Sequence, residues 1–219
     1  MNIVQIFETM WVKICGIKDV FSVLHVFVEG GNAVGFIFVP ESKRFLNLED
    51  AQKIIPSIIE IPIKKIGVFQ NEEEDKIYKI LKHFPLDGIQ FHGNESPSFC
   101  RKFKSLFLIK AFTIDFETSL ENLKREISKY SFCKILLDRK KSLGKIPWDE
   151  FLEKAYIISK DFPIILAGGV NEENLESVLS INPWGIDLSS GVEDEGGEKN
   201  LIKISKLLRK VRNKDDTSR

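Results

Sequence analysis

The sequence predicts an α/β protein that folds as a single-domain (β/α)8 barrel, the TIM-barrel architecture. Short apolar segments alternate eight times with segments of helical spacing along the 219 residues, and no linker or change of composition interrupts them. Such alternation requires a parallel sheet, because each crossover helix returns the chain for another strand in the same direction. Eight units favour a closed barrel. An open doubly wound sheet has the same alternation and is the alternative.

The expected strands are short and apolar on both faces, as in a parallel sheet covered by helices. The clearest is Ile164 to Ala167, four apolar residues between Pro163 and the pair Gly168-Gly169. By the same criterion, strands are expected at residues 11–15, 33–38, 63–69, 87–91, 106–112, 133–137 and 164–167, with the eighth in the segment 185–191. Their carboxyl ends are expected to meet at one mouth of the barrel, where the active sites of this architecture lie.

Helices of the first half are predicted from caps and apolar spacing. Asp19 is the expected cap of the first helix, and Asn47 that of a second helix ending near Pro56. Asn71 and Glu74 have the spacing of a capping box. The first helix is expected to bury an apolar face made of Ile17, Phe21, Leu24 and Val28.

Helices of the second half carry similar signals. Ser96 is the expected cap of a short helix with Pro97 at its first position. Thr118 and Glu121 form a second candidate capping box, and Asn171 is expected to cap the helix after the glycine pair. Two more helices are expected, at about 147–160 and near the end of the chain, where one side carries Leu201, Ile204, Leu207, Leu208 and Val211.

The domain organisation predicted from these elements is simple. Residues 11–212 form the barrel, residues 1–10 a short N-terminal extension, and residues 213–219 a polar tail expected to be frayed. Met10 is an alternative start of the functional chain. At this length folding buries roughly 70–75% of the unfolded surface, so a full core is available to one domain.

Composition and charge exclude several classes of function. Lysine plus arginine and aspartate plus glutamate each total 32, so the net charge is zero and no global field favours nucleic acid or an anionic membrane. No apolar run approaches the roughly 20 residues of a membrane span. The scattered Cys15, Cys100 and Cys133 fit neither a disulfide framework nor a zinc site and indicate a reducing cytoplasm. An anionic ligand must therefore be bound locally.

Two glycine-bearing strand ends lie late in the chain. Gly168-Gly169 follows one strand, and in the next strand unit Asp187 precedes the segment Ser189-Ser190-Gly191. A single glycine pair is more often only a tight turn. Two adjacent loops of this kind, with bare backbone N–H groups at helix starts, match the phosphate site of a (β/α)8 barrel. The sequence therefore predicts phosphate binding by Gly168, Gly169, Ser189, Ser190 and Gly191.

Two residues at strand ends are candidates for proton transfer. Cys15 follows an apolar strand directly, and Asp138 ends the sixth expected strand. A thiol with a lowered pKa acts as a base, and a carboxyl with a raised pKa acts as a general acid. Each also has a structural alternative, because Cys15 is small enough to be a core residue and Asp138 has Arg139 and Lys140 beside it.

Other polar residues fall at the same mouth. Arg44 follows the second strand, and its planar fork suits a carboxylate. Gln90, His92 and Asp187 are expected to line the substrate site, whereas His25 and His83 lie on helices. A lone histidine such as His92 is more often structural than catalytic. No metal-ligand spacing and no nucleotide or nicotinamide fingerprint is present, so the pattern predicts a cofactor-free reaction on a small phosphorylated compound.

The strand ends also carry a recognisable set of motifs. In order they are KICGI at 13–17, VGF at 34–36 with SKR at 42–44, GVF at 67–69, QFHGNE at 90–95, LLD at 136–138, LAGG at 166–169 and IDLSSGVE at 186–193. Each motif is weak alone. As an ordered set covering residues 11–210, they resemble the phosphoribosylanthranilate isomerase family of tryptophan biosynthesis.

The resemblance implies an Amadori rearrangement of N-(5′-phosphoribosyl)anthranilate to 1-(2-carboxyphenylamino)-1-deoxyribulose 5-phosphate. It implies Asp138 as the general acid at the furanose ring oxygen and Cys15 as the general base at C2. Arg44 would bind the anthranilate carboxylate, and the two glycine loops the phosphate. The family contains monomers and homodimers, so either state is expected.

One segment departs from the family pattern. Residues 139–148 read RKKSLGKIPW, a short and basic loop with one glycine where the family has a glycine-rich loop, and Asn200 replaces an aspartate. This departure motivates a second hypothesis, a phosphate-binding barrel that has lost catalysis and serves as a scaffold. Another phosphosugar enzyme, such as an epimerase or indole-glycerol-phosphate synthase, is disfavoured. Such enzymes need metal ligands, or a lysine that acts as a general acid, and neither is found at the strand ends.

Overall fold

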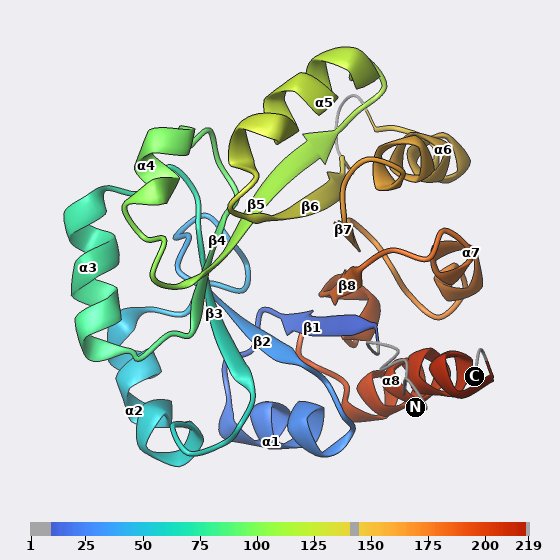
Figure 1. Ribbon diagram of the computed structural model, residues 1–219. Helices are drawn as coiled ribbons and strands as arrows, with labels where there is room; N and C mark the ends of the chain where they lie inside the picture. The colour runs from blue at the N-terminus through green and yellow to red at the C-terminus, as the bar shows by residue number, and fades with distance from the viewer. Residues whose placement is uncertain (1–9, 141–144, 218–219) are drawn as a thin grey trace, which may run out of the picture.

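The computed structural model describes residues 10–140 and 145–217 of the chain. In this part the strands follow one another around a closed parallel barrel in the order β1 to β8, and β8 pairs with β1 to close it. The helices form a ring around the strands (Figure 1). The predicted (β/α)8 barrel is confirmed, and the open doubly wound sheet is wrong.

The strands agree closely with the expected segments. The first and seventh match at both ends, the eighth lies within its expected segment, and the others differ by one or two residues at an end. Their bounds are β1 (Trp11–Cys15), β2 (Ala33–Ile37), β3 (Lys64–Phe69), β4 (Gly88–Phe91), β5 (Phe107–Ile114), β6 (Lys134–Arg139), β7 (Ile164–Ala167) and β8 (Gly185–Leu188).

Helices follow every strand. They are α1 (Val20–Val28), α2 (Leu48–Ile58), α3 (Glu74–His83), α4 (Pro97–Arg101), α5 (Leu120–Ile127), α6 (Trp148–Ser159), α7 (Leu175–Ser180) and α8 (Leu201–Thr217), with 3-10 turns η1 (Ser128–Tyr130) and η2 (Ser190–Val192). Helix α8 continues to Thr217, into the segment expected to be a frayed tail. Met10, assigned to the extension, is buried in the core, and the rest of the extension lies outside the described residues.

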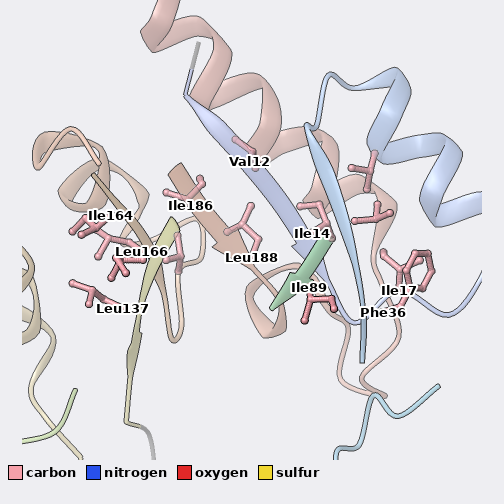
Figure 2. Close-up of a cluster of buried hydrophobic side chains, with 14 of the residues drawn as sticks. Val12, Ile14, Ile17, Phe36, Ile89, Leu137, Ile164, Leu166, Ile186 and Leu188 are labelled. Carbon is pink, nitrogen blue, oxygen red and sulfur yellow. The ribbon is translucent and has the colours of Figure 1, made fainter. Parts of the chain in front are cut away.

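The strands separate two buried layers with different chemistry. Alternate residues point outward to the helices, as Val12 and Ile14 of β1 do, and build a large apolar core. Figure 2 shows part of this layer. The inward residues include an apolar plug formed by Trp11, Ala33, Ile66, Ile109, Ala111, Leu136, Ile165 and Ala167. Nearer the carboxyl ends of the strands the inward side chains are polar. The candidate active site therefore lies at this end of the barrel.

The buried face of α1 differs from the expected one. Phe21 and Val28 are 78% and 77% exposed, whereas Ser22, Val23 and Val26 are buried. Only Ile17 of the expected face is in the core. Because nearly all residues of this helix are apolar, helical spacing fits more than one face, and packing on the barrel selects between them.

Several helix caps were predicted correctly. The side chains of Asp19, Asn47 and Ser96 accept backbone N–H groups at the starts of α1, α2 and α4. Pro56, expected near the end of α2, lies inside the helix, which ends two residues later. A proline removes one helical hydrogen bond, and here it does so in the last turn.

Three other expected caps are wrong because their side chains bond elsewhere. Asn71 adopts a left-handed conformation (φ 53°), and its side-chain oxygen accepts from the N–H of Asn94 in the loop after β4. Thr118 bonds Asp115, so Ser119 caps α5. Asn171 accepts the N–H groups of residues 173 and 174, a turn that delays α7 until Leu175.

Candidate active site

The expected proton-transfer residues lie on inward positions near the carboxyl ends of their strands. Cys15 is four residues after Trp11 on β1, and Asp138 is two residues after Leu136 on β6, so both share the parity of the inward plug. Cys15 is 5% exposed, and the Asp138 side chain is 27% exposed. Asp187 of β8 interacts electrostatically with both residues. The structure therefore brings the two candidates to one polar space.

A buried ion pair lies beneath the cysteine. The ammonium of Lys13, fully buried on β1, donates to Asp187 Oδ2 at 2.8 Å. Lys13 also interacts electrostatically with the Cys15 sulfur. Burial raises the pKa of the Cys15 thiol, and the nearby Lys13 ammonium opposes that rise. The charge state of the sulfur therefore depends on its cationic neighbour.

A second polar chain supports Asp138. The Gln90 amide nitrogen lies 3.1 Å from His92 Nδ1, and His92 Nε2 lies 3.3 Å from Asp138 Oδ2. An amide nitrogen only donates, so Nδ1 accepts and the proton on Nε2 is donated to the carboxyl. His92 thus orients Asp138, a role that sequence reasoning did not assign. The remaining oxygen of Gln90, Oε1, is buried and has no hydrogen-bond partner among the described residues.

Arg44 is held by a carboxylate rather than exposed in a free loop. Its Nε and Nη2 donate to the two Glu193 oxygens at 2.5 and 2.6 Å, and Lys199 donates to the same carboxylate at 2.5 Å. These cations lower the pKa of Glu193 even though burial raises it. The Arg44 side chain packs against Gly16, where an added Cβ would lie 2.5 Å from Arg44 Cδ. Arg44 is therefore fixed beside the residue that follows Cys15.

The two late glycine loops touch each other, as the sequence predicts. An added Cβ at Gly191 would lie 2.0 Å from the carbonyl oxygen of Val170, so only glycine fits where the loops meet. Gly168 and Gly169 have φ values of 85° and 111°, which favour glycine. The Ser189 hydroxyl donates to the carbonyl of Cys15, which ties the second loop to β1.

Charged side chains of both signs lie beside the same loops. Ser190 and Gly191 line a surface pocket with Asn171, Glu172, Glu173, Lys203 and Lys210, and Lys210 pairs with Glu172. Glycine turns that leave the backbone accessible, with lysines nearby, are a common arrangement for binding an anion. Among the described residues no cluster of three or more histidine, cysteine or acidic side chains is placed to hold a metal ion. In the same part of the chain, no helix is long and apolar enough to cross a membrane.

Comparison with known proteins decides the family. The family model described as N-(5′-phosphoribosyl)anthranilate (PRA) isomerase matches residues 12–210. The chain belongs to the phosphoribosylanthranilate isomerase family. The N-(5′-phosphoribosyl)anthranilate isomerase of Syntrophus aciditrophicus is 36% identical over 212 residues, covering 92% of this chain and 86% of the relative. That of Crocosphaera subtropica is 37% identical over 220 residues, covering 93% and 99%.

Solved structures agree with this family assignment. The crystal structure of phosphoribosyl anthranilate isomerase from Thermotoga maritima superposes with a TM-score of 0.82 at 32% identity, covering 94% of this chain and 100% of that one. A phosphoribosyl anthranilate isomerase in complex with reduced 1-(o-carboxyphenylamino)-1-deoxyribulose 5-phosphate superposes with a TM-score of 0.77 over the same shares, also at 32% identity. Both sequence and fold therefore place the chain in this family.

Three polar residues at the site were not predicted from the sequence. Lys13, Glu193 and Lys199 bond to predicted residues but had been given no role. Lys13 had a detectable signal, because a lysine at an inward position of a buried strand requires a partner. Glu193 and Lys199 had none, since the ion pair between them forms in the loop after β8 and Arg44 reaches Glu193 from a distant part of the chain. Residues 141–144 of the atypical basic loop lie outside the described residues.

Proposed function

We propose that the chain catalyses the Amadori rearrangement of N-(5′-phosphoribosyl)anthranilate to 1-(2-carboxyphenylamino)-1-deoxyribulose 5-phosphate, with Cys15 and Asp138 transferring the protons. Substrate and product contain the same atoms, so the chemistry consists of proton transfers and one ring opening. The observation that carries the proposal is the inward placement of these two residues at the carboxyl ends of β1 and β6 in a member of this family.

Ring opening needs an acid on the furanose oxygen. Asp138, acting as the general acid, donates a proton to this oxygen while the bond from C1 to the ring oxygen breaks. The lone pair of the anthranilate nitrogen forms the C1=N bond of a protonated Schiff base. The N–H that His92 donates to Asp138 fixes the carboxyl in position.

The second step needs a base at C2. The Cys15 thiolate removes the C2 proton, the electrons of that bond form C1=C2, and the C1=N electrons return to nitrogen. The resulting enolamine gains a proton at C1 and loses the one on its C2 hydroxyl to give the ketone. The thiol is then deprotonated again, and Asp138 regains its proton, so both groups are restored.

Substrate binding uses the remaining polar groups. Glu193 takes two of the five N–H donors of Arg44, and the others bind the anthranilate carboxylate. Asp187 Oδ1 and Gln90 Oε1 are buried without a hydrogen-bond partner among residues 10–140 and 145–217. A buried acceptor without a partner is costly, and sugar hydroxyl groups satisfy these two.

The phosphate end is bound by the touching glycine loops. Gly169 and Gly191 are partly exposed, Gly168 makes the turn before them, and the hydroxyl groups of Ser189 and Ser190 add polar groups at the same place. The positive φ values of the first two glycines and the contact of Gly191 with Val170 support this assignment.

Substituting the two proton-transfer residues tests the mechanism. Cys15→Ala and Asp138→Asn are each expected to lower kcat by about 10²- to 10⁴-fold, because each removes one proton-transfer group. Consumption of the anthranilate substrate is followed by its fluorescence. Cys100→Ala, at another buried cysteine, and Asp161→Asn, at an exposed aspartate, are the matched controls and should keep turnover within a few-fold.

Two results contradict the proposal in different ways. Full turnover in folded Cys15→Ala or Asp138→Asn removes the assigned roles but leaves the activity. No turnover by the unaltered chain, together with failure to restore growth of a tryptophan auxotroph lacking only this step, favours the scaffold hypothesis.

The oligomeric state and the location stay predictions. A related structure is described as monomers generated from a dimeric isomerase of Thermotoga maritima, and a monomer or a homodimer is expected for this chain. Sedimentation velocity distinguishes the two. Three free cysteines fit a reducing cytoplasm, which fractionation of the producing cells tests.

A further inference from the structure

Lys13 is a fully buried lysine in the centre of the barrel. It lies two residues before Cys15 on β1, so both side chains enter the interior from the same strand. Its partner Asp187 lies opposite it in the β1–β8 register, and their ion pair measures 2.8 Å. A buried charge is costly even when it is paired. Because burying this ion pair costs desolvation free energy, we expect a role of the pair in addition to packing.

The local geometry directs the ammonium at the sulfur. Gly35 of β2 lies beside Cys15 in the strand register. An added Cβ at this glycine would lie 2.7 Å from Cys15 Sγ and 3.1 Å from Lys13 Nζ. The sulfur and the ammonium therefore face the same small space, and Lys13 and Cys15 interact electrostatically across it. Any residue larger than glycine at position 35 would separate them.

Four charged groups act on the sulfur from the surrounding elements. Lys13 of β1 and Lys199, just before α8, favour the thiolate, whereas Asp187 of β8 disfavours it. Arg44, from the loop after β2, also interacts with Cys15 electrostatically. Burial lowers the pKa of Lys13, but Asp187 and Cys15 raise it to above its usual value, so Lys13 stays charged. Lys13 is the cation with the largest effect on the sulfur.

We propose that Lys13 is a positioning residue for the isomerase reaction: its ammonium, anchored by Asp187, lies beside the Cys15 sulfur and stabilises the thiolate that accepts the C2 proton. This inference rests on the proposed function, in which Cys15 is the base. When the sulfur takes the proton, the thiol is neutral and the ammonium keeps its bond to Asp187. Lys13 itself transfers no proton.

The test is a titration of Cys15 in the absence of substrate. Lys13→Met is made in a Cys100→Ala/Cys133→Ala background, in which Cys15 is the remaining cysteine. Thiolate absorbance near 240 nm is measured against pH, with the trace of the matching Cys15→Ala protein subtracted. The midpoint is expected to rise by about one unit or more, which lowers the thiolate fraction below the midpoint about tenfold.

Kinetics supply the second measurement. The rising limb of kcat/KM against pH is expected to move upward by the same amount in Lys13→Met, and kcat at neutral pH is expected to fall about tenfold or more. KM should change by less than about threefold, because Lys13 does not touch the substrate. Loss of packing alone would lower the melting temperature and kcat without moving either midpoint.

A second variant covers the case in which Lys13→Met does not fold, because that substitution leaves Asp187 buried without its cation. Lys13→Met/Asp187→Asn removes both charges and is expected to be more stable than Lys13→Met. Because Asp187 disfavours the thiolate, its loss alone lowers the thiol midpoint, so the midpoint of the double variant is compared with that of Asp187→Asn and is expected to be higher. The matched control is Lys110→Met/Glu95→Gln, which removes another buried pair on β5 and in the loop after β4. This control should leave the Cys15 midpoint unchanged.

The outcomes separate the two proposals. A Cys15 midpoint that is unchanged in folded Lys13→Met, or that is equal in the double variant and in Asp187→Asn, overturns the role of Lys13 and leaves Cys15 as the base. A midpoint that rises equally in the Lys110→Met/Glu95→Gln control also overturns it, because the effect is then general. Turnover retained by Cys15→Ala refutes the proposed function instead, whatever the titration shows.

Discussion

The barrel contains two buried lysine–carboxylate pairs that look alike and are built differently. Lys13 and Asp187 lie inside the barrel with side chains 0% and 7% exposed, and Lys110 and Glu95 lie near the carboxyl ends of β4 and β5 with both side chains 3% exposed. The ion-pair distances are 2.8 and 3.2 Å. Distance and burial therefore do not distinguish a site from a structural contact.

The hydrogen bonds around each pair do distinguish them. Glu95 also accepts the backbone N–H groups of Asn71 and Gly93, and Lys110 donates to the carbonyls of Gly93 and Ala111. The other carboxylate, Asp187, has an oxygen without a partner among the described residues. A buried ion pair whose polar atoms all have hydrogen-bond partners stabilises the fold, whereas a buried carboxylate oxygen without a donor is available to a ligand. The Lys110 pair is thus structural, and the Lys13 pair belongs to the site.

Breaking the structural pair gives the largest expected effect on stability. Lys110→Met leaves Glu95 buried without its cation, and the free energy of unfolding should fall by about 3–5 kcal/mol. Urea denaturation measures this loss, and kcat of the folded protein should stay within a few-fold of the unaltered chain. The comparison fails if Lys110→Met lowers kcat strongly while the unfolding midpoint stays in place.

Most of the fold could be predicted from the sequence because parallel strands are buried on both faces. Runs such as Ile164–Ala167 are then apolar throughout and end at glycines, so the strand positions agree within two residues. The face of α1 could not be predicted, because Phe21, Val23 and Val26 are all apolar and spacing alone does not choose which are buried. Tertiary packing chooses between them.

Candidate site residues could be predicted from the sequence where their position at the end of a strand alone determines where they lie. Cys15, Asp138 and Asp187 lie at the expected mouth because strand ends of a barrel converge. Contacts between distant segments were not predictable. Asn71 bonds the loop after β4 instead of capping a helix, and Glu193 neutralises Arg44 across 149 positions of the chain. Neither contact is signalled by a motif in the sequence around the residues that make it.

The Glu193 carboxylate, which binds Arg44, is intermediate between the two lysine pairs because it is expected to affect both stability and substrate binding. Glu193 accepts charge-assisted bonds from Arg44 and Lys199, and its side chain is 7% exposed. Glu193→Gln should lower the free energy of unfolding at pH 7 by about 1.5–3 kcal/mol. It should also raise KM, because Arg44 loses the group that fixes it.

The stability effect of Glu193 should depend on pH with a defined sign. Its pKa in the folded protein lies below the ordinary value of 4.5, so its contribution is complete above that pH and is lost as pH falls through the folded pKa. Urea denaturation at several pH values should show the unaltered chain and Glu193→Gln converging in acid. A stability gap that stays constant from pH 7 into acid would contradict this assignment.

The smallest expected effect tests whether the Lys110 pair is only structural. The buried Tyr130 hydroxyl donates to the Glu95 carbonyl at 2.8 Å, and burial raises its pKa to about 12, so it remains a donor at working pH. Tyr130→Phe should lower the free energy of unfolding by about 0.5–1.5 kcal/mol and leave kcat unchanged. Tyr156→Phe, at a tyrosine 47% exposed, is the matched control. Because Glu95 and Gly93 lie just beyond His92, a tenfold loss of kcat in Tyr130→Phe would mean that this network also positions the histidine bonded to Asp138.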